Sequence, residues 1–364
     1  MHGHARWFAP GRVNLIGDHT DYQLGWVLPF AVAQGTTVTV DLNDTSRLEL
    51  RSSQFGAAPS RDLDRLATYP RSWASYVDGA VVLLRSEGVA IRGAHIEVDS
   101  DLPPGSGLAS SAAVTVATLA ALLDAAGGEA EPAAVAALAQ RVENEHVGAA
   151  VGYMDPAAVM FGSAGHALLI DTRTHDVEAL ALPTVSAGIA FVLFDTGRRH
   201  ATSGAEYAAR VAECARAAAA MSVPSLRDVD DASALMNVTD PIVRARARHV
   251  VTENSRVLKV AELLRSGDVA SIGAHLVASH VSLRDDFDAS TPELDAIVDA
   301  ALSAGALGAR LTGAGFGGAV LAMWRNDEVS AVVDEVRATV ASRDMPPPTV
   351  REVTPSAGAT AVPL

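Results

Sequence analysis

Hydrophobic and polar positions alternate along much of the first hundred residues, a pattern typical of half-buried strands. Residues 36–42 (TTVTVDL), 47–51 (RLELR) and 94–99 follow it, and an apolar run covers residues 27–32. Residues 72–85 (SWASYVDGAVVLLR) instead have helical spacing, with Trp73, Tyr76 and Val77 on one face. Residues 52–62 show neither period and are expected to form a loop. The pattern therefore predicts a mainly β beginning followed by a helix.

Helical patterns dominate the later chain, and strands are expected only at residues 165–171, 188–195 and at the end of 311–323. Helices are expected at 112–126, from Pro132 to Gly148, and at 245–266 and 267–277, the last two being split at Gly267. The length of 364 residues favours two domains. The best hinge is Leu182-Pro183-Thr184, which predicts domains at 1–184 and 185–364. The tail from Pro346 carries little information.

Composition excludes several classes of partner. The net charge of −15 argues against nucleic acid and against an anionic membrane. The single cysteine, Cys214, rules out an intramolecular disulfide and fits a reducing compartment. We find no targeting segment and no apolar run long enough to cross a bilayer. A soluble, cytoplasmic protein is expected. A monomer is also expected, although the oligomeric state cannot be derived from the sequence.

The scarcity of lysine excludes two common ways of holding ATP. Lys259 is the only lysine of the chain. A Walker A loop needs a Gly-Lys-Ser/Thr, and protein kinases need a strand lysine on the phosphates. Any nucleotide phosphates must therefore be held by backbone amides, by a metal ion or by arginine.

The segment 9–22 (APGRVNLIGDHTDY) packs Arg12, Asp18, His19 and Asp21 beside a short apolar run. Asp and His suit a ligand rich in hydroxyl groups, and Arg suits an anion. Gly11 and Gly17, on the two sides of this apolar run, allow tight turns of the backbone. A capped turn with surface charges is the plainer alternative. Spacing alone favours a short buried strand that ends in a binding loop.

A second motif lies at residues 101–113 (DLPPGSGLASSAA), where a Gly-rich loop enters the helix expected at 112–126. Ser110 and Ser111 stand where this helix should begin, and Ser is a favoured N-cap residue. Free N–H groups at the positive end of a helix can bind phosphate, and a serine hydroxyl can bind Mg²⁺. An ordinary capped helix explains the same letters.

Two acidic residues and a second glycine-rich run follow. Asp155 stands between Met154 and Pro156 in an apolar setting, where an unpaired carboxylate is costly. Glu143, twelve residues earlier, reads on residue type alone as a solvated helix charge. Residues 311–323 (LTGAGFGGAVLAM) indicate a backbone folded closely against a neighbour.

In this order, the three runs resemble the galactokinases, within the wider family of galacto-, homoserine, mevalonate and phosphomevalonate kinases. The resemblance extends from Ala9 to about Leu321. It implies an α+β fold of two domains, an N-terminal domain like a ribosomal-protein fold and a C-terminal ferredoxin-like domain, with the active site between them. It also implies ATP-dependent phosphorylation of D-galactose at the anomeric C1 hydroxyl.

The same resemblance implies roles for individual residues. Arg12 and Asp155 would be catalytic. The sugar would be bound by Asp18, His19, Asp21, Gly152 and Tyr207, with Asp18 at the C6 hydroxyl. ATP would be bound by Trp73, Pro104, Gly105, Ser106, Gly107, Leu108, Ser110 and Ser111. Mg²⁺ would be held by Ser111 and Glu143.

Departures from the family pattern leave the exact sugar open. Asp18 replaces a more usual glutamate, Gln23 an asparagine, Pro156 a glutamine and Ala314 a glycine. The alternatives are a sister kinase for N-acetylgalactosamine, arabinose, a heptose or mevalonate, and a non-catalytic sugar sensor. Such sensors lack a Ser-Ala pair that is present here as Ser111-Ala112.

Overall fold

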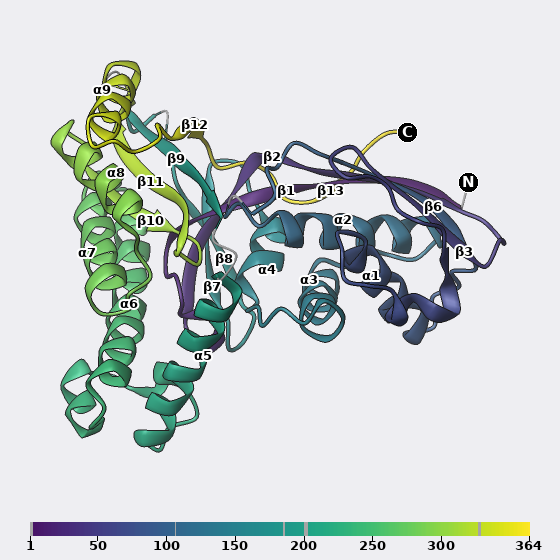
Figure 1. Cartoon of the computed structure of the whole chain (residues 1–364), viewed down its shortest axis with the longest axis horizontal. Coiled ribbons are helices and arrows are strands. Elements are labelled where there is room, and N and C mark those ends of the chain that lie inside the picture. The colour runs from purple at the N-terminus through teal and green to yellow at the C-terminus, as the bar shows by residue number, and fades with distance from the viewer. Residues whose placement is uncertain (1–2, 106, 185, 200–202, 327–328) are drawn as a thin grey trace.

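Two β-sheets, each packed against its own helices, make up the two halves of the molecule (Figure 1). The computed structural model describes residues 3–105, 107–184, 186–199, 203–326 and 329–364. The first half holds the N-terminus and the second half holds most of the residues after 189. This arrangement confirms an α+β fold of two domains.

A long antiparallel hairpin forms the backbone of the first sheet. Its strands are β1 (His4–Ile16) and β2 (Trp26–Leu42), and the segment 17–25 that joins them carries the predicted binding loop. The sheet runs in the order β13-β1-β2-β6-β3-β4, with β5 beside β3, and β7 beside β2 and β8. The other strands are β3 (Arg47–Ser52), β4 (Gly56–Ala57), β5 (Arg61–Asp62), β6 (Ala94–Ser100), β7 (His166–Asp171) and β8 (Val177–Ala181).

The helices of the first half cover one face of this sheet (Figure 1). At their centre lies α2 (Ser110–Ala125), which packs against β1 and β2 and is buried almost all round because it is built from Ala, Val and Leu. Around it lie α1 (Ala74–Ser86), α3 (Pro132–Arg141) and α4 (Met154–Phe161). α3 continues into a π-helical turn, Val142–Val147, that ends at Gly148.

The second sheet runs in the order β10-β11-β9-β12. Its strands are β9 (Ile189–Arg199), β10 (Gly308–Thr312), β11 (Gly317–Arg325) and β12 (Thr349–Val353). Its helices are α5 (Ser203–Ala220), α6 (Pro241–Ser266), α7 (Ile272–Asp285), α8 (Pro292–Ser303) and α9 (Val329–Ala341). Short helical turns complete the chain at Asp21–Gln23, Leu63–Thr68, Leu226–Asp228 and Ala232–Asn237.

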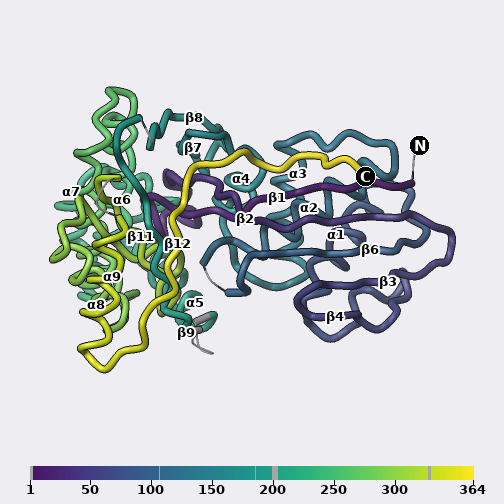
Figure 2. Tube along the Cα trace, turned by 90° about the horizontal axis from the view of Figure 1, so that it is seen from above, coloured from purple at the N-terminus to yellow at the C-terminus, as the bar shows by residue number. Residues whose placement is uncertain are grey.

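The C-terminal residues return to the first half of the molecule. β13 (Thr360–Ala361) pairs with β1, and the tail reaches it from β12 as a yellow trace along the molecule (Figure 2). On the way, the Ser356 N–H donates to the Ala31 carbonyl and the Gly358 N–H to the Gly162 carbonyl. The tail read as uninformative thus ties the two halves together. The domain boundary at 184/185 remains a prediction, and residue 185 lies outside the described residues.

Most expected elements are present, with differences at their ends. The loop expected at 52–62 contains the short strands β4 and β5. The helix expected at 267–277 begins only at Ile272 and extends to Asp285, because Gly267 has a φ of 77° and ends the preceding helix. Over the described ranges, each helix is either too short or too polar to cross a membrane.

Candidate active site

Two adjoining cavities lie beside the predicted binding loop. One, of about 620 Å³, is lined from both halves by the loop 17–21, the segment 147–155, α5 and the glycine-rich run after β10. The other, of about 500 Å³, is lined by the start of α2, the start of α1 and the β3–β4 turn. Val147 lines both cavities. We call them the inner cavity and the outer cavity.

A bidentate ion pair lies in the inner cavity. Arg12 leaves β1 next to a shift in its register with β2, and such a bulge redirects a side chain. Its Nε donates to Asp155 Oδ1 at 2.8 Å and its Nη2 to Asp155 Oδ2 at 2.7 Å, while Nη1 donates to the Gly107 carbonyl. Asp155 stands in the first turn of α4, where the helix dipole favours a carboxylate. Both predicted catalytic residues therefore meet at one point.

Asp21 presents a second carboxylate to the inner cavity. Burial, with the neighbouring charge of Asp155, raises the pKa of Asp21 from its ordinary 3.8 to about 7. Gly152 makes room for it, since a Cβ at Gly152 would overlap Asp21 Oδ2. The Tyr22 backbone N–H donates to this carboxylate, which keeps further acceptor positions for the hydroxyl groups of a ligand.

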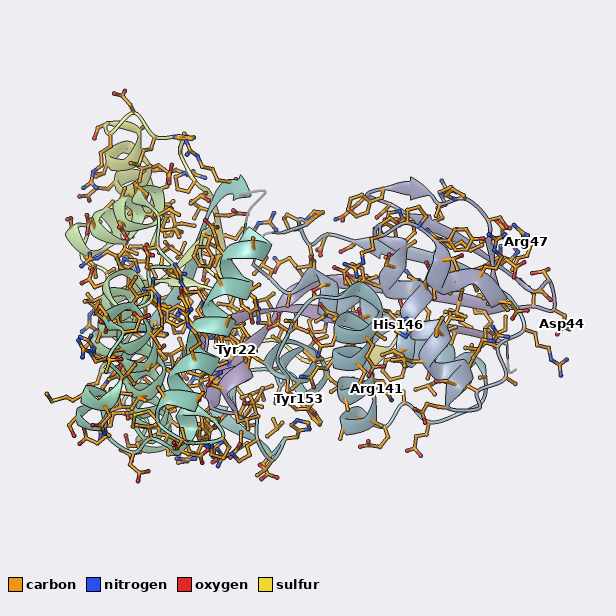
Figure 3. The ribbon with its side chains drawn as sticks, turned by 60° about the horizontal axis from the view of Figure 1, so that its bottom comes forward. Tyr22, Asp44, Arg47, Arg141, His146 and Tyr153 are labelled. Atoms are coloured by element: carbon orange, nitrogen blue, oxygen red, sulfur yellow. The ribbon has the colours of Figure 1, made fainter. Side chains whose placement is uncertain are left out.

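His19 lies in the wall of the inner cavity as a neutral imidazole. Burial lowers its pKa from 6.5 to about 4. Its Nε2 donates to the Ala314 carbonyl at 2.9 Å, which leaves Nδ1 to accept from the Tyr22 hydroxyl at 3.1 Å. The rings of Tyr207 and Phe287 pack against it at 5.6 and 4.4 Å. Tyr22 lies toward the C-terminal half, whereas Asp44 and Arg47 mark the far end of the first half (Figure 3).

Asp18 also lines the inner cavity, but its carboxylate already has protein partners. Oδ2 forms an ion pair with Arg310 Nη2, and Oδ1 accepts from the Gly313 N–H at 3.0 Å. Its side chain is 2% exposed and that of Arg310 is fully buried. The sequence predicted Asp18 as a sugar ligand but did not predict these contacts.

Helix α6 holds the backbone of the binding loop from behind. Glu253 Oε1 accepts from the Gly17 N–H at 3.0 Å, and Asn254 Oδ1 accepts from the Trp26 N–H at 2.9 Å. His249 Nε2 donates to the Asp18 carbonyl at 3.1 Å. Sequence reasoning missed all three residues. Their signal was three hydrogen-bonding residues, at positions 249, 253 and 254, on one side of an otherwise amphipathic helix.

The start of α2 opens into the outer cavity without a side-chain cap. The helix begins at Ser110 as expected, but Ser110 and Ser111 occupy its first turn, and Ala109, with a φ of 56°, precedes it. No described side chain caps this end, so its N–H groups are free for an anion. Pro104 and Gly105 line the same cavity, while Leu108 is buried in the core. Ser106, also predicted here, lies outside the described residues.

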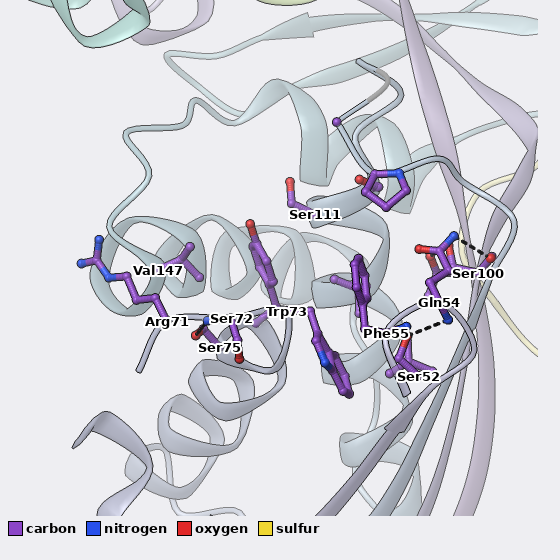
Figure 4. A pocket seen from close by; sticks show the side chains of 17 residues that line it. Ser52, Gln54, Phe55, Arg71, Ser72, Trp73, Ser75, Ser100, Ser111 and Val147 are labelled. Atoms are coloured by element: carbon purple, nitrogen blue, oxygen red, sulfur yellow. Dashed lines mark hydrogen bonds between the residues drawn. The ribbon is translucent and has the colours of Figure 1, made fainter. Parts of the chain in front are cut away.

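Aromatic side chains form the other wall of the outer cavity (Figure 4). Trp73, the predicted ATP contact, lies nearly parallel to Phe55, with ring planes 14° apart and centroids separated by 6.3 Å. Tyr76 lines the cavity nearby, and burial raises the pKa of its hydroxyl. Phe55 was missed because its stretch was read as loop. An exposed aromatic residue in a polar loop was the signal available.

Glu143 is buried close to Ser111, which lines the outer cavity, and to Asp155, which lines the inner cavity. Burial and the charge of Asp155 raise its pKa from 4.5 to about 8, against the effect of a hydrogen bond with Ser111. Its side chain is 3% exposed, so the reading as a solvated helix charge is wrong. Among the described residues, we find no cluster of three or more His, Cys, Asp or Glu side chains suited to a metal. Mg²⁺ commonly takes one or two carboxylates plus substrate phosphates, and this chemistry fits Glu143 and Ser111.

Comparison with known families identifies three matching regions. Residues 2–42 match the galactokinase galactose-binding signature, residues 75–163 match the N-terminal domain of GHMP kinases and residues 260–342 match the C-terminal domain of GHMP kinases. These regions contain the binding loop, the start of α2 and the glycine-rich run after β10.

Whole-length relatives agree with the family matches. The chain is 43% identical over 353 residues to a galactokinase of Mycobacterium tuberculosis, covering 96% of this chain and 97% of that one. It is 43% identical over 359 residues to a galactokinase of Streptomyces coelicolor, covering 97% and 93%. The structure of Lactococcus lactis galactokinase complexed with galactose superimposes with a TM-score of 0.94 at 30% identity, covering 99% and 95%.

Proposed function

The chain belongs to the galactokinases of the GHMP kinase family and is a kinase, and we propose that it phosphorylates D-galactose at the C1 hydroxyl with ATP. The products would be galactose 1-phosphate and ADP. The observation that carries this proposal is the Arg12–Asp155 pair, held by two hydrogen bonds in the inner cavity beside the uncapped start of α2. This geometry supports an acceptor site next to a phosphate site, as phosphoryl transfer requires.

The sugar would occupy the inner cavity. Asp21 would accept hydrogen bonds from its hydroxyl groups, and Tyr207 and His19 would pack along one side. Gly152 would contribute by leaving space, because a side chain there would displace Asp21. Asp155 would accept the hydrogen bond of the C1 hydroxyl and orient its oxygen towards the phosphorus.

ATP would occupy the outer cavity, with its phosphates at the start of α2. The free N–H groups of the first turn and the loop at Pro104 to Gly107 would hold the phosphates, and Trp73 would contact the base. Gly107, with a φ of 77°, keeps the loop backbone in a conformation that L side chains rarely adopt. Arg12 would stabilise the charge of the transferring phosphoryl group.

Mg²⁺ would be held by Glu143 and Ser111, and it would supply charge neutralisation at the phosphates. In the transfer, a bond forms between the C1 oxygen and the γ-phosphorus, and the bond to the β-phosphate oxygen breaks. The hydroxyl proton leaves by way of Asp155. Bound Mg²⁺ would favour the ionised form of Glu143, whose pKa is raised to about 8 by burial and by the charge of Asp155.

A coupled ADP-release assay over a panel of sugars tests the proposal. The panel should contain galactose, N-acetylgalactosamine, arabinose and a heptose, each with and without Mg²⁺. We expect ADP release to depend on galactose and on the metal. Release that is faster with another sugar, or equal without any sugar, would contradict the assignment of the substrate.

A further inference from the structure

Arg310 contacts Asn14 and Leu15 near the end of β1 and Asp18 in the binding loop. Its Nη1 donates to the Leu15 carbonyl at 2.9 Å and to the Asn14 carbonyl at 3.3 Å, and its Nη2 pairs with Asp18. It stands on β10 in the second half of the molecule and is fully buried. One planar guanidinium therefore sets the place of residues 14–18 relative to the second sheet.

Asp18, the partner of Arg310, also forms a hydrogen bond with the glycine-rich run after β10, as does its neighbour His19. Asp18 Oδ1 accepts from the Gly313 N–H, and the adjacent Ala314 carbonyl accepts from His19 Nε2. Both side chains at positions 18 and 19 are thus bonded to the segment that directly follows Arg310. Each oxygen of the Asp18 carboxylate already accepts from a buried donor, so a sugar hydroxyl would have to share it.

We propose that Arg310 is a positioning residue of the sugar site, and that Asp18 acts through it rather than as a direct ligand of the sugar. The inference rests on the proposed function and assigns a residue that the motifs did not indicate. The Arg310–Asp18 pair holds the loop so that Asp21 and His19 face the inner cavity. Neither Arg310 nor its partners line the outer cavity, so nucleotide binding should be independent of the pair.

The first test replaces the planar guanidinium of Arg310 with an ammonium group, which keeps the positive charge. Arg310→Lys loses the simultaneous contacts to the backbone carbonyls and to Asp18, because an ammonium is a point charge. We expect the KM for galactose to rise about 10-fold or more while the KM for ATP stays within about twofold. Arg61→Lys is the matched control, since Arg61 is also buried and ion-paired, with Asp78, but does not contact the loop. Wild-type kinetics for galactose in Arg310→Lys would overturn the proposal.

The second test separates positioning from direct contact. Galactose and 6-deoxygalactose are compared in the wild type and in Asp18→Asn. A positioning role predicts that Asp18→Asn lowers kcat/KM by the same factor for both sugars. The ratio of kcat/KM for galactose to kcat/KM for 6-deoxygalactose is then the same as in the wild type. A direct bond from Asp18 to the C6 hydroxyl predicts that this galactose-to-6-deoxygalactose ratio of kcat/KM is about 5-fold or more smaller in Asp18→Asn than in the wild type. That second outcome would overturn the proposal.

A double variant tests the proposal if Arg310→Lys does not fold. Should Arg310→Lys fail to fold, the double variant Asp18→Asn with Arg310→Met removes both buried charges together, a change that proteins often tolerate. The raised KM for galactose with unchanged KM for ATP is expected there too, and a wild-type KM for galactose would overturn the proposal. If the wild type itself releases no ADP with galactose, the proposed function fails, which is a distinct result from this one.

Discussion

The inner and outer cavities differ in how their polar groups are satisfied before any ligand binds. In the inner cavity, Asp18 and His19 are bonded to Arg310, Gly313 and Ala314 from the second half of the molecule. In the outer cavity, the start of α2 is left uncapped by the described side chains, and the walls come from the first half. The binding loop at the inner cavity is thus fixed by protein contacts, while the start of α2 at the outer cavity keeps backbone N–H groups free.

The two cavities also differ in the charged residues at their walls. Carboxylates face the inner cavity and its border, where the pKa values of Asp21 and Glu143 rise to about 7 and about 8. Among the described residues that line the outer cavity, Arg71 is the charged one. In the proposed function, the carboxylates and Arg12 would act on the acceptor sugar, whereas shape and backbone amides would hold the nucleotide.

Breaking the catalytic pair should produce the largest effect. We expect Asp155→Ala to lower kcat by about 10²–10⁴-fold and to leave ATP binding nearly intact, because the group removed acts on the acceptor. Steady-state kinetics and calorimetric titration with ATP measure the two quantities. Asp44→Ala, an exposed aspartate at the far end of the first half, is the control. A wild-type kcat in Asp155→Ala would show that Asp155 is misassigned.

Filling the space beside Asp21 should have the next largest effect. A methyl group at Gly152 would overlap the Asp21 carboxylate and displace it. We expect Gly152→Ala to lower kcat/KM for galactose on the order of 10²-fold, mainly through KM. Gly128→Ala, where a methyl group meets only ordinary contacts, is the control. Unchanged kinetics in Gly152→Ala would mean that Asp21 does not contact the sugar.

Neutralising Glu143 should change how stability depends on pH. The pKa of Glu143 in the folded protein, about 8, lies above its ordinary 4.5, so between these values the folded state keeps a proton that the unfolded chain has lost. The free energy of unfolding of the metal-free protein should therefore fall as pH rises from about 5 to about 8. In Glu143→Gln this fall should be smaller by on the order of 2 kcal/mol.

Urea denaturation at a series of pH values measures the effect of Glu143. Glu97→Gln, on an exposed position of β6, serves as the control and should follow the wild type. Asp21 and Asp78 also have raised pKa values, so part of the pH dependence should remain in the Glu143 variant. Identical slopes for the wild type and Glu143→Gln would contradict a buried, protonated carboxyl at this position.

Removing one aromatic wall of the outer cavity should give the smallest effect. Phe55 lies parallel to Trp73 and is 52% exposed, so it contributes stacking area rather than core packing. We expect Phe55→Ala to raise the KM for ATP about 3- to 10-fold and to leave the KM for galactose unchanged. Met236→Ala, an exposed apolar residue of the second half, is the control. An unchanged KM for ATP would remove Phe55 from the nucleotide site.

The sequence predicted the residues of the site better than their partners. Arg12, Asp21, Gly152 and Asp155 lie in contiguous motifs, and the structure brings them around one cavity. Arg310 and Glu253 were not assigned, because they reach the loop across more than 200 residues of chain and their local signals are weak. For Arg310 the available hint was a lone arginine in the apolar strand before the glycine-rich run.

The same limit applies to the fold. The alternating pattern identified β3, β6 and the second half of β2 because each buries mainly one face, and burial of one face imposes a period of two. It did not identify β13 or the return of the tail to β1, since two paired residues leave no periodic signal. The raised pKa of Glu143 was equally hidden, because it depends on burial by tertiary packing and on the charge of Asp155.

The most direct test of the account is to identify the phosphorylated product by phosphorus NMR after incubation with galactose, ATP and Mg²⁺. The Arg12–Asp155 pair is proposed to orient the C1 hydroxyl, so the account predicts phosphate on C1 in the wild type and formation of the same product about 10²–10⁴-fold more slowly with Asp155→Ala. Phosphate on another carbon, or consumption of ATP without a sugar phosphate, would contradict it.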